Sequence, residues 1–91
     1  MRLFVLEGSK LRNEAAFWQE YLAVVRPDGA EYFGRNLAAF HDAITGGGPG
    51  WPGPNCHLRI ANHAAAGVGR KFLAAVAAIA SGSEDFEFEL D

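Results

Sequence analysis

The stretch at residues 32–46 reads YFGRNLAAFHDAITG and contains both ends of a short helix. Asn36 has the side chain type that caps a helix N-terminus, and Gly46 is a typical helix stop. Between them, bulky side chains recur at i, i+3, i+4 and i+7, namely at Leu37, Phe40, His41 and Ile44. This spacing predicts a helix that begins after Asn36 and turns one face toward a core.

Three other segments have the patterns of β-strands. Arg2–Glu7 contains four consecutive apolar residues, which predicts a strand covered on both faces and placed at the centre of its sheet. Cys56–Ile60 alternates apolar and polar residues. The stretch at residues 86–91 alternates Phe or Leu with acids, which predicts a final strand with a charged outer face.

Two further helices are predicted besides these strands and the helix after Asn36. The first is capped by Asn13 and ends at Arg26-Pro27. Its apolar stripe consists of Phe17, Tyr21, Val24 and Val25. The second runs from about Val68 to Ala80, with a stripe formed by Phe72, Val76 and Ile79. Strands separated by helices predict an α/β fold with a three-stranded parallel sheet packed with helices.

Length and composition limit the class of protein. The 91 residues fit one domain, 1–91, and the net charge of −3 disfavours nucleic acid as a partner. Cys56 is the only cysteine, which excludes an intrachain disulfide and a four-cysteine zinc site. No leader pattern is present, and no apolar run approaches the roughly 20 residues of a membrane span. We therefore expect a cytoplasmic protein that does not bind membranes.

The catalytic candidates are weak. Cys56 and His57 are adjacent in a predicted strand, so their side chains point to opposite faces and do not form a thiol–base pair. His41 and Asp42 lie roughly 100° apart on a helix and do not face each other. The histidines at 41, 57 and 63 lack metal-ligand spacing. We expect no enzyme activity, no metal and no cofactor, and an enzyme using Cys56 or His41 is the least favoured alternative.

The segment Gly46–Pro54 contains glycines and prolines with Trp51 among them. It lacks the lysine and hydroxyl residue of a phosphate-binding loop and precedes a strand rather than a helix, which predicts a plain spacer loop. Trp51 has two interpretations, an anchor at an interface or a side chain folded over the core.

The stretch at residues 32–46 resembles the signature of the barstar family of ribonuclease inhibitors. The shared pattern is an aromatic pair, Gly, Asn-Leu, an acid later in the helix, and Thr-Gly at its end. The similarity extends to Glu7–Arg12, to Phe17-Trp18 and to Glu84-Asp85-Phe86. The resemblance implies a barstar-like fold and a bacterial immunity protein of toxin–antitoxin type, a monomer when free. Its implied partner is a small basic microbial ribonuclease, barnase-type or related, whose active site it blocks.

The resemblance also assigns roles to individual residues. Asp42 matches the carboxylate that enters the phosphate site of the nuclease, and Tyr32 matches an aromatic that packs on it. Asn36 matches the capping asparagine, for which a plain capping role and a direct contact remain open. Thr45 and Gly46 match the end of the motif, which lies at the rim of the interface with the nuclease. The whole predicted binding set is Tyr32, Phe33, Gly34, Asn36, Leu37, Ala38, His41, Asp42, Thr45 and Gly46.

Several positions depart from the family pattern. Ala38 replaces the first motif carboxylate, one helical turn before Asp42, and His41 replaces an aromatic. Arg35 adds a positive charge beside the motif. Alanines stand where the family has a further acid on the long helix, namely Ala77, Ala78 and Ala80. We therefore expect an altered partner, and the alternative is a barstar-fold protein–protein interaction module without nuclease inhibition.

Overall fold

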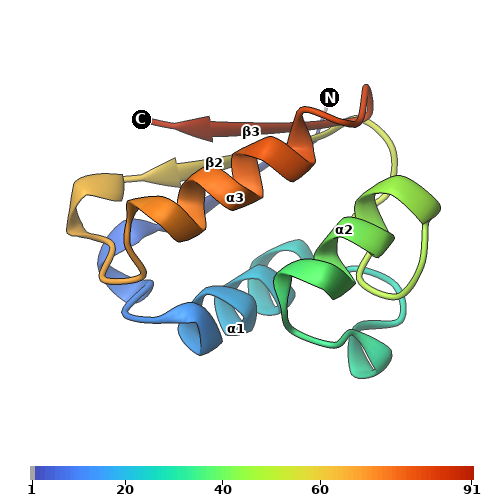
Figure 1. Cartoon of the computed structure of the whole chain (residues 1–91), viewed down its shortest axis with the longest axis horizontal. Coiled ribbons are helices and arrows are strands. Elements are labelled where there is room, and N and C mark those ends of the chain that lie inside the picture. The colour runs from blue at the N-terminus through green and yellow to red at the C-terminus, as the bar shows by residue number, and fades with distance from the viewer. Residues whose placement is uncertain (1) are drawn as a thin grey trace.

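The computed structural model describes residues 2–91 and places a sheet in one layer with its helices on one side (Figure 1). The strands are β1 (Arg2–Glu7), β2 (Cys56–Ala61) and β3 (Phe86–Leu90). The helices are α1 (Glu14–Val25), α2 (Leu37–Gly46) and α3 (Arg70–Ala80). Short 3-10 turns lie at Gly8–Lys10, Ala30–Tyr32 and His63–Ala65. This is the predicted α/β fold. Among residues 2–91, no helix is long and apolar enough to cross a membrane.

The strands pair in the order β1-β2-β3, and both pairings are parallel. The prediction of a central first strand is wrong, because β2 holds the centre and β1 lies at an edge. Leu3 and Val5 are 58% and 44% exposed. The physical reason is the single helical layer: it covers only one face of the sheet, so the apolar run of β1 is not buried on both sides.

The alternation predicted for β2 is confirmed. Cys56, Leu58 and Ile60 are fully buried beneath the helices. His57 and Arg59 point to the opposite, uncovered face. This uncovered side of the sheet is called the open face below.

The acids of β3 also lie on the open face, as predicted. His57 Nε2 lies 2.7 Å from Glu89 Oε1, and His57 Nδ1 lies 3.8 Å from Glu87 Oε2. Arg59 Nε is 3.9 Å from the other Glu89 oxygen. These contacts are exposed and contribute little to stability.

Helix α1 supplies the centre of the core. Its predicted cap is confirmed, since Asn13 Oδ1 accepts the N–H of Ala16 at 2.8 Å. The predicted stripe is partly wrong: Val24 is 36% exposed, and Trp18 is buried in its place. The Trp18 ring contacts aromatic rings from four elements or loops of the fold, at Phe17, Tyr21, Phe33, Phe40 and Phe72.

Helix α3 covers the β3 side of the sheet. It begins at Arg70, two residues later than predicted, because Gly69 with φ 91° lies outside helical geometry. Phe72 and Val76 are buried as expected, and Ile79 is half-buried. Helix α2 packs beside α3, which places residues 32–46 on the same side of the molecule as the α3 surface.

Candidate protein-binding site

The start of α2 is fixed by its cap. Asn36 Oδ1 accepts the N–H of Ala39 at 2.7 Å, and Asn36 Nδ2 donates to the Gly34 carbonyl at 3.2 Å. Arg35 turns the chain into the cap with φ 54°, a left-handed value that is uncommon for a residue with a side chain. The capping role predicted for Asn36 is confirmed, and a direct contact with a partner stays open because the side chain is exposed.

The inner face of α2 packs into the core. Phe40, Ala43 and Ile44 are buried, and Leu37 is half-buried. His41 belongs to the same apolar spacing and lies at the edge of this face, with its side chain 59% exposed. The reason is helical geometry: at 100° per residue His41 is carried to the flank, and the small Ala43 occupies the buried position instead.

The outer face of α2 carries the predicted acid. The Asp42 side chain is 86% exposed, and its nearest ionic neighbour is His41, with 3.9 Å between Asp42 Oδ1 and His41 Nδ1. That distance exceeds a hydrogen bond, so the carboxylate keeps its bonding capacity for another molecule. Thr45 is also exposed, although its hydroxyl donates to the His41 carbonyl at 2.7 Å.

Two neighbouring aromatics divide between surface and core. Tyr32 is 76% exposed, whereas Phe33 is 6% exposed and packs edge-on against Trp18. Phe33 thus supports this surface from below. The exposed members of the predicted binding set define the α2 surface, which consists of Tyr32, Gly34, Asn36, Ala38, His41, Asp42, Thr45 and Gly46, and the exposed Arg35 lies next to them in the chain.

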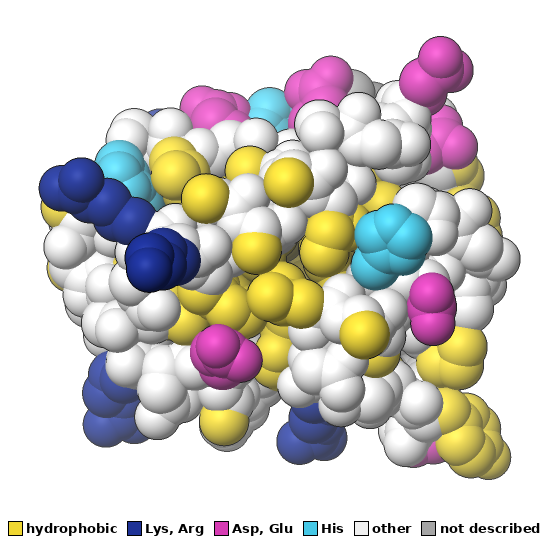
Figure 2. All heavy atoms as spheres, in the orientation of Figure 1, with side chains coloured by type: hydrophobic (Ala, Val, Ile, Leu, Met, Phe, Trp, Pro, Cys, Tyr) yellow, Lys and Arg dark blue, Asp and Glu magenta, His cyan; other side chains and the backbone are white. Residues whose placement is uncertain are grey.

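The surface of α3 beside α2 has no carboxylate. Its sequence, RKFLAAVAAIA, exposes Ala74 and Ala78 and keeps both charges in the first turn. Figure 2 shows this face of the molecule: hydrophobic side chains dominate over α3, and acidic side chains gather along the sheet edge above it. Asp42 is therefore the only acid that α2 and α3 contribute between them.

The glycine- and proline-rich loop after α2 is docked on the molecule. Buried Tyr21 donates its hydroxyl to the Gly50 carbonyl at 2.8 Å, and the Gly50 N–H donates to the Asp28 carbonyl at 3.1 Å. Gly50 has φ 94°, and a Cβ there would lie 2.5 Å from the Phe33 ring. Sequence reasoning missed this contact because it depends on close tertiary approach.

Trp51 lies on the outside of this loop. It is half-buried and lines a depression of about 320 Å³ with Asp28 and Pro49. It also borders a second depression of about 240 Å³ beside Arg26 and Pro52. Both interpretations of Trp51 stay open, because the ring is partly covered and partly available.

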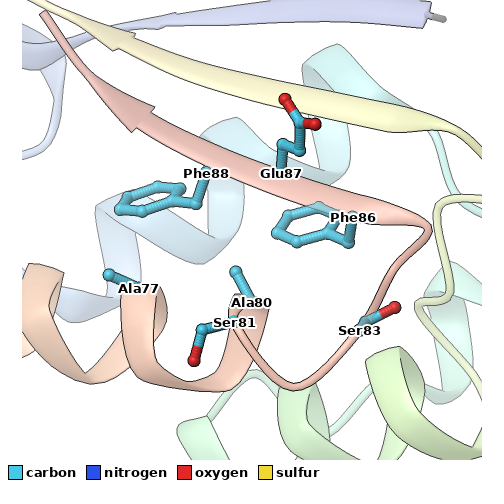
Figure 3. A pocket seen from close by; sticks show the side chains of 7 residues that line it. All are labelled: Ala77, Ala80, Ser81, Ser83, Phe86, Glu87 and Phe88. Carbon is cyan, nitrogen blue, oxygen red and sulfur yellow. The ribbon is translucent and has the colours of Figure 1, made fainter.

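A larger groove lies between α3 and β3 (Figure 3). Its volume is about 400 Å³, and Phe88 points toward α3 along it, whereas Glu87 points away from it on the other side of the strand. Its hydroxyls are engaged internally: Ser81 donates to the Ala78 carbonyl at 2.7 Å, and Ser83 Oγ accepts a backbone N–H at 3.2 Å. The groove therefore offers few free polar groups to orient a small molecule.

The thiol–base pair is ruled out by the geometry. Cys56 is fully buried, and burial raises the pKa of its thiol to about 11. His57 points to the open face and bonds Glu89 there. Across residues 2–91, no group of three or more His, Cys, Asp or Glu side chains is arranged to hold a metal ion.

No curated protein matches the sequence. The model of the family described as Barstar (barnase inhibitor) matches residues 1–89, which is nearly the whole chain. The fold agrees with this match, since a three-stranded parallel sheet packed with three helices is consistent with a barstar-like protein. The chain belongs to the barstar family.

Proposed function

We propose that the protein inhibits a small basic microbial ribonuclease, barnase-type or related, by covering the active site of that enzyme with the α2 surface. The family to which the chain belongs is described as barnase inhibitors. Such an inhibitor acts inside the bacterial cell that makes the nuclease, as an immunity protein. The observation that carries the proposal is the exposed, weakly paired carboxylate of Asp42 on a rigidly capped helix.

The chemistry follows from charge complementarity. A ribonuclease active site is a cationic cleft that binds phosphate. A carboxylate held at 86% exposure presents the same charge as an RNA phosphate. Complementary fields accelerate the encounter, and charge-assisted hydrogen bonds formed on docking slow the release. Tyr32, 76% exposed in the turn before α2, adds an aromatic side chain of the type that anchors protein interfaces.

The small number of acids supports an altered partner. Ala38 precedes Asp42 by one helical turn, and Ala78 is exposed on α3. A nuclease cleft lined by several cations would leave some of them unpaired against these methyl groups, which costs affinity. The protein therefore fits best a nuclease with one dominant cationic pocket bordered by apolar surface.

The test is inhibition of a panel of small microbial guanyl-preferring ribonucleases, measured with purified protein at increasing inhibitor concentration. We expect micromolar or tighter inhibition of at least one enzyme. Asp42→Ala should weaken that inhibition at least tenfold, about 1.4 kcal/mol. Ala38→Asp should strengthen binding to multiply cationic nucleases, because it places a second carboxylate one helical turn before Asp42.

The matched control is Glu87→Ala. It removes one exposed acid from the open face, away from α2, so it changes the net charge as Asp42→Ala does. Glu87→Ala should leave inhibition within about twofold of wild type. Equal losses in the two variants would contradict a local role for Asp42. The absence of inhibition across the panel would contradict the proposal and favour the alternative, an interaction module without nuclease inhibition.

A further inference from the structure

The outer edge of β1 carries backbone groups that the sheet does not use. The Arg2 N–H donates to the Asn55 carbonyl at 2.9 Å, so the ladder to β2 uses Arg2 and every second residue after it. Because strand residues alternate in direction, Leu3 and Val5 aim their N–H and C=O groups away from β2. Among residues 2–91, no other segment hydrogen-bonds these groups.

The side chains at this edge are apolar. Leu3 and Val5 are 58% and 44% exposed on the open face, and the run Leu3–Leu6 contains no charge and no proline. Charges, prolines and bulges are the usual features that prevent an exposed edge from pairing with another strand. The Arg2 side chain lies on the other face of the strand, where it donates to the Pro52 and Pro54 carbonyls.

The opposite edge of the sheet is protected. The segment at residues 84–91, which contains β3, holds five of the eleven acidic residues of the chain. Two β3 edges would therefore repel each other, whereas two β1 edges bring no like charges together between Leu3 and Leu6. Pairing at β1 also places the two acidic segments at opposite ends of the combined sheet.

We propose that β1 pairs with β1 of a second copy of this chain, in antiparallel orientation, to form a continuous six-stranded sheet. The two-fold axis passes Phe4, so Leu3 of each copy lies opposite Val5 of the other. In this register the outward N–H and C=O groups of Leu3 and Val5 bond one another. Both facing residues point to the same side, so their side chains form one apolar strip on the open face.

The self-complementary register favours a second copy over a foreign strand. A two-fold contact needs one surface that matches itself, and Leu3 and Val5 satisfy that condition with similar side chains at both positions. The paired edges are short, and their contact falls below the roughly 800 Å² per partner of a standard interface. The dimer is therefore weak and forms at high protein concentration, in contrast to the monomer expected from the sequence.

The proposed dimer leaves the α2 surface free. Helix α1 packs against β1, whereas α2 packs beside α3 on the β3 side. A dimer through β1 thus presents two copies of the α2 surface. The inference does not depend on the inhibitor proposal, and either can fail without the other.

The test is sedimentation equilibrium of the full chain from low micromolar to millimolar concentration. We expect the average mass to rise from 9.8 kDa toward twice that value. Leu3→Lys should weaken association at least tenfold, because it places charges along the paired edge. The amides of Leu3 and Val5 should become slower to exchange with deuterium as concentration rises.

The control is Leu90→Lys, the same change at a 39% exposed position on β3. It should leave association unchanged, with circular dichroism verifying that both variants fold. A mass of one chain at every concentration would overturn the proposal. A dimer that Leu90→Lys weakens as much as Leu3→Lys does would overturn its assignment to β1.

Discussion

Tyr32 and Phe33 are adjacent aromatics of similar size, yet the first is 76% exposed and the second 6%. The same division recurs within α2, where the Asp42 side chain is 86% exposed and Ala43 is fully buried. Among the buried members, Phe33 packs against Trp18 in the core cluster, whereas the side chains of Tyr32 and Asp42 are largely in solvent. Adjacent residues in this segment therefore differ in role: the inner ones pack in the core, and the outer ones are free for the binding that we propose.

The division between inner and outer residues explains how the chain keeps the barstar fold although alanines replace acids of the family pattern. Ala38 and the exposed Ala78 lie on the outer side, where packing does not select the side chain. Replacing an acid there changes the charge presented to a partner and leaves the core intact. The inner aromatics have no such freedom, because their volume fills a closed cluster.

The largest effect that tests this division is expected for Phe33→Ala. Removal of a buried phenyl ring should lower the free energy of unfolding by about 3–5 kcal/mol. The ring also covers Gly50, so the loop that Tyr21 anchors should loosen with it. Urea denaturation measures the loss, and Phe33→Leu serves as a control that keeps most of the volume. A loss below about 1 kcal/mol would show that the ring is not part of the core.

Much of the fold was predictable because local patterns agreed with the tertiary structure. The alternation of β2, the helix caps at Asn13 and Asn36, and the end of α1 at Arg26 follow from short-range rules. The position of β1 was not predictable from its own residues. An apolar run predicts burial, but whether helices cover one face of a sheet or two depends on all the connections together.

The candidate site was likewise predictable from the sequence only in part. The resemblance pointed to residues 32–46, and the structure shows that Tyr32 and Asp42 of that stretch are exposed. The support beneath that surface was not visible in the sequence. The docking of Gly50 on Tyr21 and Phe33 joins residues distant in the chain, and a glycine-rich segment gives no signal of where it will pack.

An intermediate effect on stability is expected at Asn36, which is exposed but also caps α2. Asn36→Ala removes the acceptor for the Ala39 N–H and should lower the free energy of unfolding by about 1 kcal/mol. Thermal or urea denaturation measures this change. Asn36→Asp retains an oxygen for the cap and should restore stability. If Asn36→Asp is stable yet binds a nuclease much less tightly, Asn36 has a direct contact besides its capping role.

The smallest effect on stability is expected for Tyr32→Ala. Its ring is 76% exposed, so truncation should change the free energy of unfolding by no more than about 0.5 kcal/mol. Inhibition of a responsive nuclease should nevertheless weaken, because aromatic side chains contribute strongly at interfaces. In the same assay, Tyr32→Phe distinguishes the contribution of the ring to inhibition from that of the hydroxyl. If Tyr32→Ala destabilises the protein as much as Phe33→Ala does, the ring packs on its own molecule in solution, and the inner and outer sides of this segment are not separable.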